Sequence, residues 1–278
     1  MDPDDYRRTS REIWERMAPG WEDRRDWVWD SSRLVGEWLV DRVDPQPGQT
    51  LLELAAGAGD TGFAALARMA GTGRLISTDF SHRMIQAAQR RAAELGLKNV
   101  EFRVMDAERM DLEENSVDGV LCRWGYMLMA DPLSALRETR RVLRDGGRLA
   151  FSVWASSEEN LWASVPARVL VERGHMPAPE PGAPGIFAMA DPRLVRELVT
   201  SAGFSEPESE FVRMAWRFDD FDGYWEFLVR LAGSLAMTIN KLPPDEQKAV
   251  RSDVRELLSV DDKDSFDLTG VTLNSVTS

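Results

Sequence analysis

The 278-residue sequence has little cysteine and no long apolar run, and each shortage excludes a class of protein. Its only cysteine is Cys122, so an internal disulfide and a thiolate metal cluster are both excluded. The segment 1–14 has no apolar signal core, and no stretch of about 18 apolar residues is available to span a bilayer. We therefore expect a soluble, cytoplasmic protein without a bound metal ion.

Positive charge is also scarce. The sequence has 34 lysines and arginines against 47 aspartates and glutamates, which gives a formal net charge of -13 at pH 7. No block of basic residues gathers the positive charge into one stripe, and an acidic surface repels a phosphate backbone. Nucleic acid is therefore not an expected partner. The composition does not distinguish a monomer from a homodimer.

Predicted strands and helices alternate through the segment 46–155. We expect helices at 61–70, 82–95 and 131–147, with Ser81 as the N-cap of the second. The expected strands of this segment lie at 50–54, 73–78, 99–104, 118–124 and 148–154. Strands that alternate with helices form a parallel sheet, so the sequence predicts a doubly wound, Rossmann-like α/β fold.

The segments that flank this core differ from it in composition and in pattern. The segment 1–45 is a helical leader that holds half of the ten tryptophans, and we expect it to act as a lid. Residues 156–220 are expected to contain an insertion loop, a helix at 191–204 and a sixth strand at 208–218. Residues 221–260 are expected to form a two-helix cap, with helices at 221–239 and 243–260. A seventh strand in 261–278 would complete the sheet.

The turn after the first predicted strand, in LLELAAGAGDTG (51–62), is rich in glycine. Gly57, Gly59 and Gly62 satisfy G-x-G-x-x-G, and Asp79 lies about 20 residues further on, as in dinucleotide-binding sites. Glu53 argues against a dinucleotide, because a pyrophosphate at this turn would meet a like charge. An acid at this position suits a ligand with cationic groups. An NAD(P)- or flavin-dependent oxidoreductase nevertheless remains an alternative.

Three segments carry a family resemblance. LELAAGAG, LISTDFS (75–81) and VMDAERM (104–110) resemble the first three motifs of class I S-adenosylmethionine-dependent methyltransferases. The leader sequence IWERMAPGWEDR resembles the helix that precedes this fold in the quinone-methyltransferase-like branch. The resemblance is close over 13–155. Ala55 replaces the family's first glycine, a substitution that we expect to be tolerated if its φ is negative.

This resemblance implies a cofactor site for S-adenosyl-L-methionine, with S-adenosyl-L-homocysteine as the product. Asp79 would accept hydrogen bonds from both ribose hydroxyls, Asp106 would accept one from the adenine amino group, and Trp21 would cover the methionine part. The residues expected around the cofactor are Trp21, Glu53, Ala55, Ala56, Gly57, Ala58, Gly59, Asp79, Phe80, Ser81, Met84, Asp106, Ala107, Arg123 and Trp124.

The implied reaction is methyl transfer to a small, apolar or aromatic acceptor by in-line displacement. The aromatic residues Trp14, Tyr224, Trp225 and the neighbouring Leu228 are expected to form a lid over the acceptor, although such a helical stripe also suits an ordinary core. A catalytic base is optional in this chemistry, and the candidates are Tyr126, His175 and His82. A non-catalytic binding protein with a methyltransferase fold is a second alternative.

Overall fold

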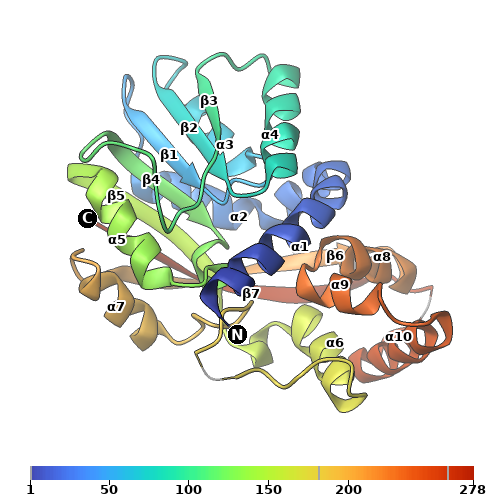
Figure 1. Ribbon diagram of the computed structural model, residues 1–278. Coiled ribbons are helices and arrows are strands. Elements are labelled where there is room, and N and C mark those ends of the chain that lie inside the picture. Colours follow the sequence, from blue (N-terminus) through green and yellow to red (C-terminus); the bar gives the residue numbers. More distant parts are fainter. Residues whose placement is uncertain (1, 181, 262) are drawn as a thin grey trace.

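The computed structural model describes residues 2–180, 182–261 and 263–278 (Figure 1). Its centre is a seven-stranded sheet with the order β3-β2-β1-β4-β5-β7-β6. The strands are β1 (Thr50–Leu54), β2 (Arg74–Asp79), β3 (Val100–Val104), β4 (Val117–Arg123), β5 (Leu143–Trp154), β6 (Glu208–Phe218) and β7 (Phe266–Thr277). Strands β1 to β5 are parallel, whereas β7 runs antiparallel to both β5 and β6. The predicted Rossmann-like α/β fold is confirmed.

Helices cover both faces of this sheet. They are α1 (Pro3–Asp23), α2 (Arg25–Val43), α3 (Asp60–Arg68), α4 (His82–Glu94), α5 (Pro132–Val142), α6 (Leu161–Glu172), α7 (Pro192–Ser201), α8 (Phe221–Leu231), α9 (Ser234–Ile239) and α10 (Pro244–Leu258), with the 3-10 turns η1 (Tyr126–Leu128) and η2 (Ser157–Glu159). Leu51 packs in a core with α2 and α3, whereas the next residue, Leu52, packs in the core that includes α5. Successive strand residues point to opposite faces, which separates the two cores. No helix among the described residues is long and apolar enough to cross a membrane.

The helical leader that the sequence predicts at 1–45 forms two helices, α1 and α2. The chain changes direction at Arg24, between α1 and α2. Helix α1 lies between α4 and α8 (Figure 1). The α1 side chain Glu22 forms an ion pair with Arg90 of α4, with an Nε–Oε1 distance of 2.6 Å. Glu15 accepts a hydrogen bond of 2.6 Å from the backbone N–H of His82, at the start of α4. These contacts fix α1 beside the carboxyl ends of the strands.

The sequence pattern did not predict helix α6, which lies in the first part of 156–220, where only an insertion loop was expected before the helix at 191–204. The helix contains Pro166, which has no N–H to donate to the carbonyl of Trp162 one turn earlier. The hydroxyl of Tyr224 in α8 supplies the missing donor at 2.8 Å. A contact distant in sequence therefore completes this helix. The described residues of 175–185 form neither helix nor strand, as the proline and glycine content predicted.

Two predicted boundaries were also wrong. The helix expected at 131–147 ends at Val142, because Leu143 already pairs with Val117 of β4. The helix expected at 221–239 is interrupted at Gly233, whose φ of 55° lies in the region that glycine favours. This break separates α8 from α9, and residues on both sides of it reach the cavity described below.

Candidate active site

The carboxyl ends of β1, β2 and β4 open into a cavity of about 270 Å³ that α1 covers. One part of its wall, the polar end, comprises Glu53, Ala55, Ala56, Gly57, Ala58, Asp79, Phe80, Met84, Asp106 and Ala107. The other part, the aromatic end, comprises Trp124, Trp154, Trp162, Trp216, Phe227 and Leu231. Parallel sheets of this type bind ligands at the carboxyl ends of their strands. The cavity is therefore the candidate active site.

The glycine turn forms the floor of the polar end. Gly57 and Gly59 have φ values of 56° and 88°, and a side-chain carbon added at Gly57 would meet no atom within 4 Å. Ala55 has a φ of 49°, so the condition of a negative φ for an alanine at this position is not met. Its methyl group fits because Gly125 lies opposite, where an added carbon would be 2.8 Å from the Ala55 Cβ. The absence of a side chain at Gly125 thus leaves space for the methyl group of Ala55.

Glu53 is a buried acid at the end of β1. One carboxylate oxygen accepts a hydrogen bond of 2.7 Å from the N–H of Gly62, and the other accepts one of 3.2 Å from the hydroxyl of Ser77. Burial raises the pKa of Glu53 to about 7. A carbon added at Gly62 would collide with this carboxylate. The third glycine of the turn therefore makes room for an acid, which a pyrophosphate site would not need.

Asp79 ends β2 and holds the glycine turn in place. Its Oδ2 accepts a hydrogen bond of 3.0 Å from the N–H of Gly57, and its Oδ1 accepts one of 2.9 Å from the N–H of Ser81. Burial raises the pKa of Asp79 to about 6. Since each carboxylate oxygen has two lone pairs, both can still accept a ligand hydroxyl.

Asp106 follows β3 and is the third acid on the wall of the polar end. Its Oδ1 accepts a hydrogen bond of 3.0 Å from the N–H of Glu108, while its Oδ2 has no hydrogen-bond partner among the described residues. Glu53, Asp79 and Asp106 therefore line one cavity from three neighbouring strands.

Arg123 and Trp124 end β4 and connect the two ends of the cavity. Arg123 donates from Nε to the hydroxyl of Thr61 at 3.0 Å and from Nη1 to the hydroxyl of Ser32 at 2.7 Å. Its guanidinium lies 4.6 Å from the ring centroid of Trp124, and that ring stacks on Trp154 at 4.5 Å. Burial lowers the pKa of Arg123, whereas the charges of Asp60 and Glu53 raise it.

Helix α1 closes the cavity from the outside. Trp14 and Trp21 both lie on its wall, and Trp21 donates from Nε1 to the carbonyl of Leu231 at 3.1 Å, which links α1 to α8. Sequence analysis missed Tyr6 and Arg7, because they precede the segment that carries the family resemblance. The hydroxyl of Tyr6 donates to the carbonyl of Leu128 at 3.0 Å, and Arg7 forms an ion pair with Glu108.

The aromatic end differs from the predicted lid. Tyr224 and Leu228 are fully buried and Trp225 is partly buried, and none of the three lines the cavity. Tyr224 packs against Phe218 with a centroid distance of 5.2 Å and binds α6, and Trp225 faces Arg251 of α10. Phe227 and Leu231, on the same helix, reach the cavity instead. The helical periodicity predicts which side of α8 is buried, but it does not predict that Phe227 and Leu231 are the buried residues that face the cavity.

The candidate bases also lie elsewhere. Tyr126 is fully buried and shares a hydrogen bond of 2.7 Å with Thr139, and burial raises its pKa well above the usual value. His175 lies 3.1 Å from a carboxylate oxygen of Glu246 in α10, and His82 is exposed beside Gln86. None of these three candidates lines the cavity, so the structure does not place any of them at the candidate active site.

Two of the predicted cofactor residues lie outside the cavity wall and instead stabilise the start of a helix. Gly59 does not line the cavity, and its position before α3 requires its positive φ. Ser81 is also outside the cavity wall, and its hydroxyl accepts a hydrogen bond of 3.2 Å from the N–H of Met84 as the N-cap of α4. The other predicted cofactor residues line the cavity.

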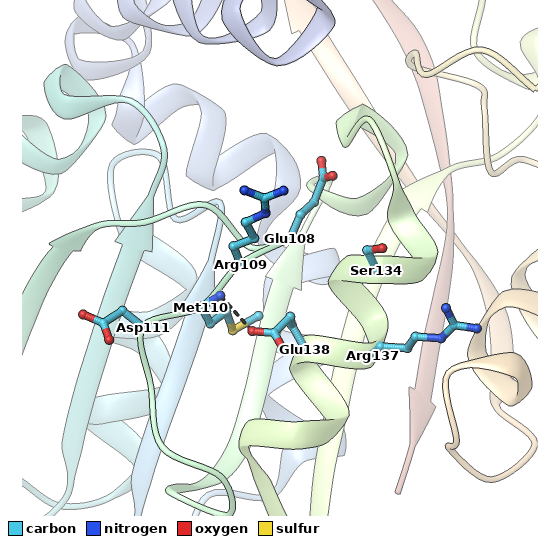
Figure 2. Close-up of a pocket in the computed structure, with 7 residues that line it drawn as sticks. All are labelled: Glu108, Arg109, Met110, Asp111, Ser134, Arg137 and Glu138. Atoms are coloured by element: carbon cyan, nitrogen blue, oxygen red, sulfur yellow. Dashed lines mark hydrogen bonds between the residues drawn. The ribbon is translucent and has the colours of Figure 1, made fainter. Parts of the chain in front are cut away.

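A second hollow, of about 520 Å³, lies between the loop after β3 and helix α5 (Figure 2). Its wall consists largely of charged side chains, and the N–H of Met110 donates to Glu138 across it at 2.8 Å. The lining residues are Glu108, Arg109, Met110, Asp111, Ser134, Arg137 and Glu138. It lacks the apolar wall that small-molecule sites have, so we assign the ligand site to the cavity under α1.

Comparison with known proteins agrees with this geometry. Residues 45–170 match a family model described as a methyltransferase domain. The chain is 35% identical over 140 residues to the ubiquinone/menaquinone biosynthesis C-methyltransferase UbiE of Acidiphilium cryptum, a match that covers 50% of this chain and 55% of that protein. It is 32% identical over 118 residues to the aklanonic acid methyltransferase DauC of a Streptomyces species, covering 42% of this chain and 54% of that protein.

The fold is also shared with solved structures. The YcgJ protein of Bacillus subtilis aligns with a TM-score of 0.56 and 16% identity over 87% of this chain and 97% of that one. Residues 45–170 are thus similar to a methyltransferase domain, and the fold is shared with solved structures. The matches span only about half the length of the two curated relatives described above.

Proposed function

We propose that this protein transfers a methyl group from S-adenosyl-L-methionine to a small, apolar or aromatic acceptor. The observation that carries the proposal is that Glu53, Asp79 and Asp106 line a single cavity whose other end is aromatic. When bound, the cofactor supplies a methyl group on a positively charged sulfur, with a neutral thioether as the leaving group.

The polar end fits this cofactor. Asp79 has free lone pairs for the two ribose hydroxyls, and Asp106 has a free oxygen for the adenine amino group. Glu53 is a buried acid without an ion pair among the described residues, and the ammonium of the cofactor would compensate its charge. Trp21 and Trp14 would exclude water from the methionine part.

The aromatic end supports a flat or apolar acceptor. Four tryptophans and Phe227 contribute to its wall, and they contact one another at centroid distances such as 4.9 Å for Trp154 and Trp162. Aromatic surfaces bind flat, apolar molecules by burial and stacking. One relative is named for ubiquinone and menaquinone biosynthesis and the other for aklanonic acid, which agrees with this assignment.

The side chains supply alignment more than proton transfer. Neither of the two histidines of the sequence lines the cavity, and Tyr6, which does, has a pKa raised to about 12 by burial. In this proposal the acceptor atom is nucleophilic without a histidine or tyrosine as base, as an acidic enol or phenol is. Held by the aromatic end, such an acceptor would approach the methyl group in line with the carbon–sulfur bond.

Thermal stabilisation by purified ligands tests this proposal. S-adenosylhomocysteine should raise the unfolding temperature and NAD should not, because Glu53 opposes a pyrophosphate. The opposite result would instead support the oxidoreductase. A screen of phenols and quinols with labelled cofactor should then give a methylated product, detected by mass. Binding of S-adenosylhomocysteine without any transfer would favour a non-catalytic binding protein.

A further inference from the structure

Arg123 is a partly buried arginine that forms no ion pair with any described residue. Thr61 and Ser32 hold its Nε and Nη1 through neutral hydroxyls, and its Nη2 makes no hydrogen bond to a described residue. Buried charges in proteins are normally paired. The two other arginines on the cavity wall follow this rule, since Arg7 pairs with Glu108 and Arg25 pairs with Glu94.

Trp124 adds a second unused donor at the same strand end. Trp124 is only 8% exposed and lines the cavity. Its indole N–H has no hydrogen-bond partner in the described part of the chain. The residue has a φ of 60°, an uncommon value for a bulky side chain. Backbone strain of this kind is concentrated at functional sites.

We propose that Arg123 and Trp124 form an oxyanion site at the end of β4, where the Arg123 guanidinium and the Trp124 indole N–H bind a negatively charged ligand oxygen. Both groups are donors only, they lie 4.6 Å apart as measured from the guanidinium carbon to the ring centroid, and both line the cavity. Ser32 and Thr61 orient the guanidinium without neutralising it, so its charge stays available to the ligand.

Two sources can supply such an oxygen. One is the carboxylate of the cofactor's amino-acid end, and the other is the ionised hydroxyl of an acidic acceptor. The first fits the contact of Arg123 with Thr61, which lies beside the glycine turn, and the second fits the stacking of Trp124 on the aromatic end. The identity of the ligand rests on the proposed function, whereas the oxyanion chemistry does not.

The first arm of the test compares two adenosyl ligands by calorimetry. S-adenosylhomocysteine and S-adenosyl-3-thiopropylamine differ only in the carboxylate, which the second compound lacks. If the cofactor is the source, the wild type should prefer S-adenosylhomocysteine, and Arg123→Met should reduce this preference about tenfold or more, as expected for a charge-assisted hydrogen bond. Trp124→Phe keeps an aromatic ring, removes the N–H and should reduce the preference by a smaller factor, about threefold.

The second arm compares two quinones by equilibrium dialysis. 2-Hydroxy-1,4-naphthoquinone is an anion at neutral pH, whereas 2-methoxy-1,4-naphthoquinone has nearly the same shape and no charge. If the acceptor is the source, the wild type should prefer the anion, and Arg123→Met should remove about tenfold of that preference.

Thermal unfolding distinguishes binding from a structural role. Arg123→Met removes a partly buried charge that has no ion-pair partner, so the unfolding temperature without ligand should not fall. Arg141→Met is the matched control, because Arg141 pairs with Glu138 and lies outside the cavity wall. This control should lower the unfolding temperature and leave both ligand preferences unchanged.

A loss of either ligand preference in Arg123→Met supports the oxyanion site, and the preference that is lost identifies the ligand that supplies the oxygen. The proposal is overturned if Arg123→Met folds and keeps both preferences within about twofold of the wild type, a change too small for a lost charged hydrogen bond. If the wild type binds neither adenosyl ligand, the proposed methyl transfer fails, and the quinone pair alone then decides the oxyanion site.

Discussion

The two ends of the cavity are built in different ways. The polar end consists of carboxylates and backbone groups from one continuous stretch of alternating strands and helices, between Glu53 and Ala107. The aromatic end gathers rings from β5, α6, β6 and α8, which are far apart in the chain. The first end is specified by local turns, whereas the second exists only when the whole domain has folded.

The largest expected effect on ligand binding comes from removing the polar end's central acid. In the proposed function, Asp79→Ala deletes the acceptor for both ribose hydroxyls, and it also removes the hydrogen bond that Asp79 accepts from the N–H of Gly57. The affinity for S-adenosylhomocysteine should fall about 100-fold in calorimetry, since bonds to a charged acceptor contribute about 2 to 3 kcal/mol. Asp118→Asn is the control, because Asp118 binds Thr50 and Arg144 outside the cavity wall, and it should leave the affinity unchanged. Equal losses in both variants would contradict the assigned role.

The second effect is a pH dependence that belongs to the polar end. The folded protein raises the pKa of Glu53 from 4.5 to about 7 and so binds a proton that the unfolded chain releases. Its contribution to stability is therefore fully present below pH 4.5 and is lost as the pH rises through 7. The unfolding free energy of the wild type minus that of Glu53→Gln should fall by about 3 kcal/mol across this window, as urea titrations would measure. A difference that stays constant, or that rises with pH, would refute the assignment.

The third effect should be confined to the aromatic end. Phe227→Ala should weaken binding of 2-methoxy-1,4-naphthoquinone about tenfold and leave S-adenosylhomocysteine binding nearly unchanged, because Phe227 lines only the aromatic end. Trp225→Ala, on the same helix but outside the cavity wall, is the control and should change neither affinity. If Trp225→Ala weakened the quinone as much as Phe227→Ala, the originally predicted lid would be supported instead.

The smallest effect concerns the backbone of the glycine turn. Ala55 has a φ of 49°, whereas its neighbour Ala56 does not have a positive φ. Ala55→Gly should therefore relieve strain, while Ala56→Gly should only increase the entropy of the unfolded chain. We expect the unfolding free energies of these two variants to differ by about 1 kcal/mol in favour of Ala55→Gly. Similar values for both variants would show that Ala55 is not strained.

The same contrast explains what the sequence could predict. The positions of Glu53, Asp79 and Asp106 follow from strand ends and turn residues, which are local signals. The position of Trp162 on the cavity wall could not be predicted, because Pro166 argues against a helix at α6. The hydrogen bond that completes this helix comes from Tyr224, which is distant in sequence. The periodicity of α8 indicates a buried stripe, but only packing decides that Phe227 reaches the cavity and Tyr224 does not.

The position of β7 between β5 and β6 has a consequence for how the chain is made. One edge of β5 has no partner until β7 has been synthesised, more than a hundred residues later. During translation this apolar edge is open to pairing with other nascent chains. Slow growth at low temperature, or a holdase chaperone that covers β5, should therefore raise the yield of folded protein in recombinant expression.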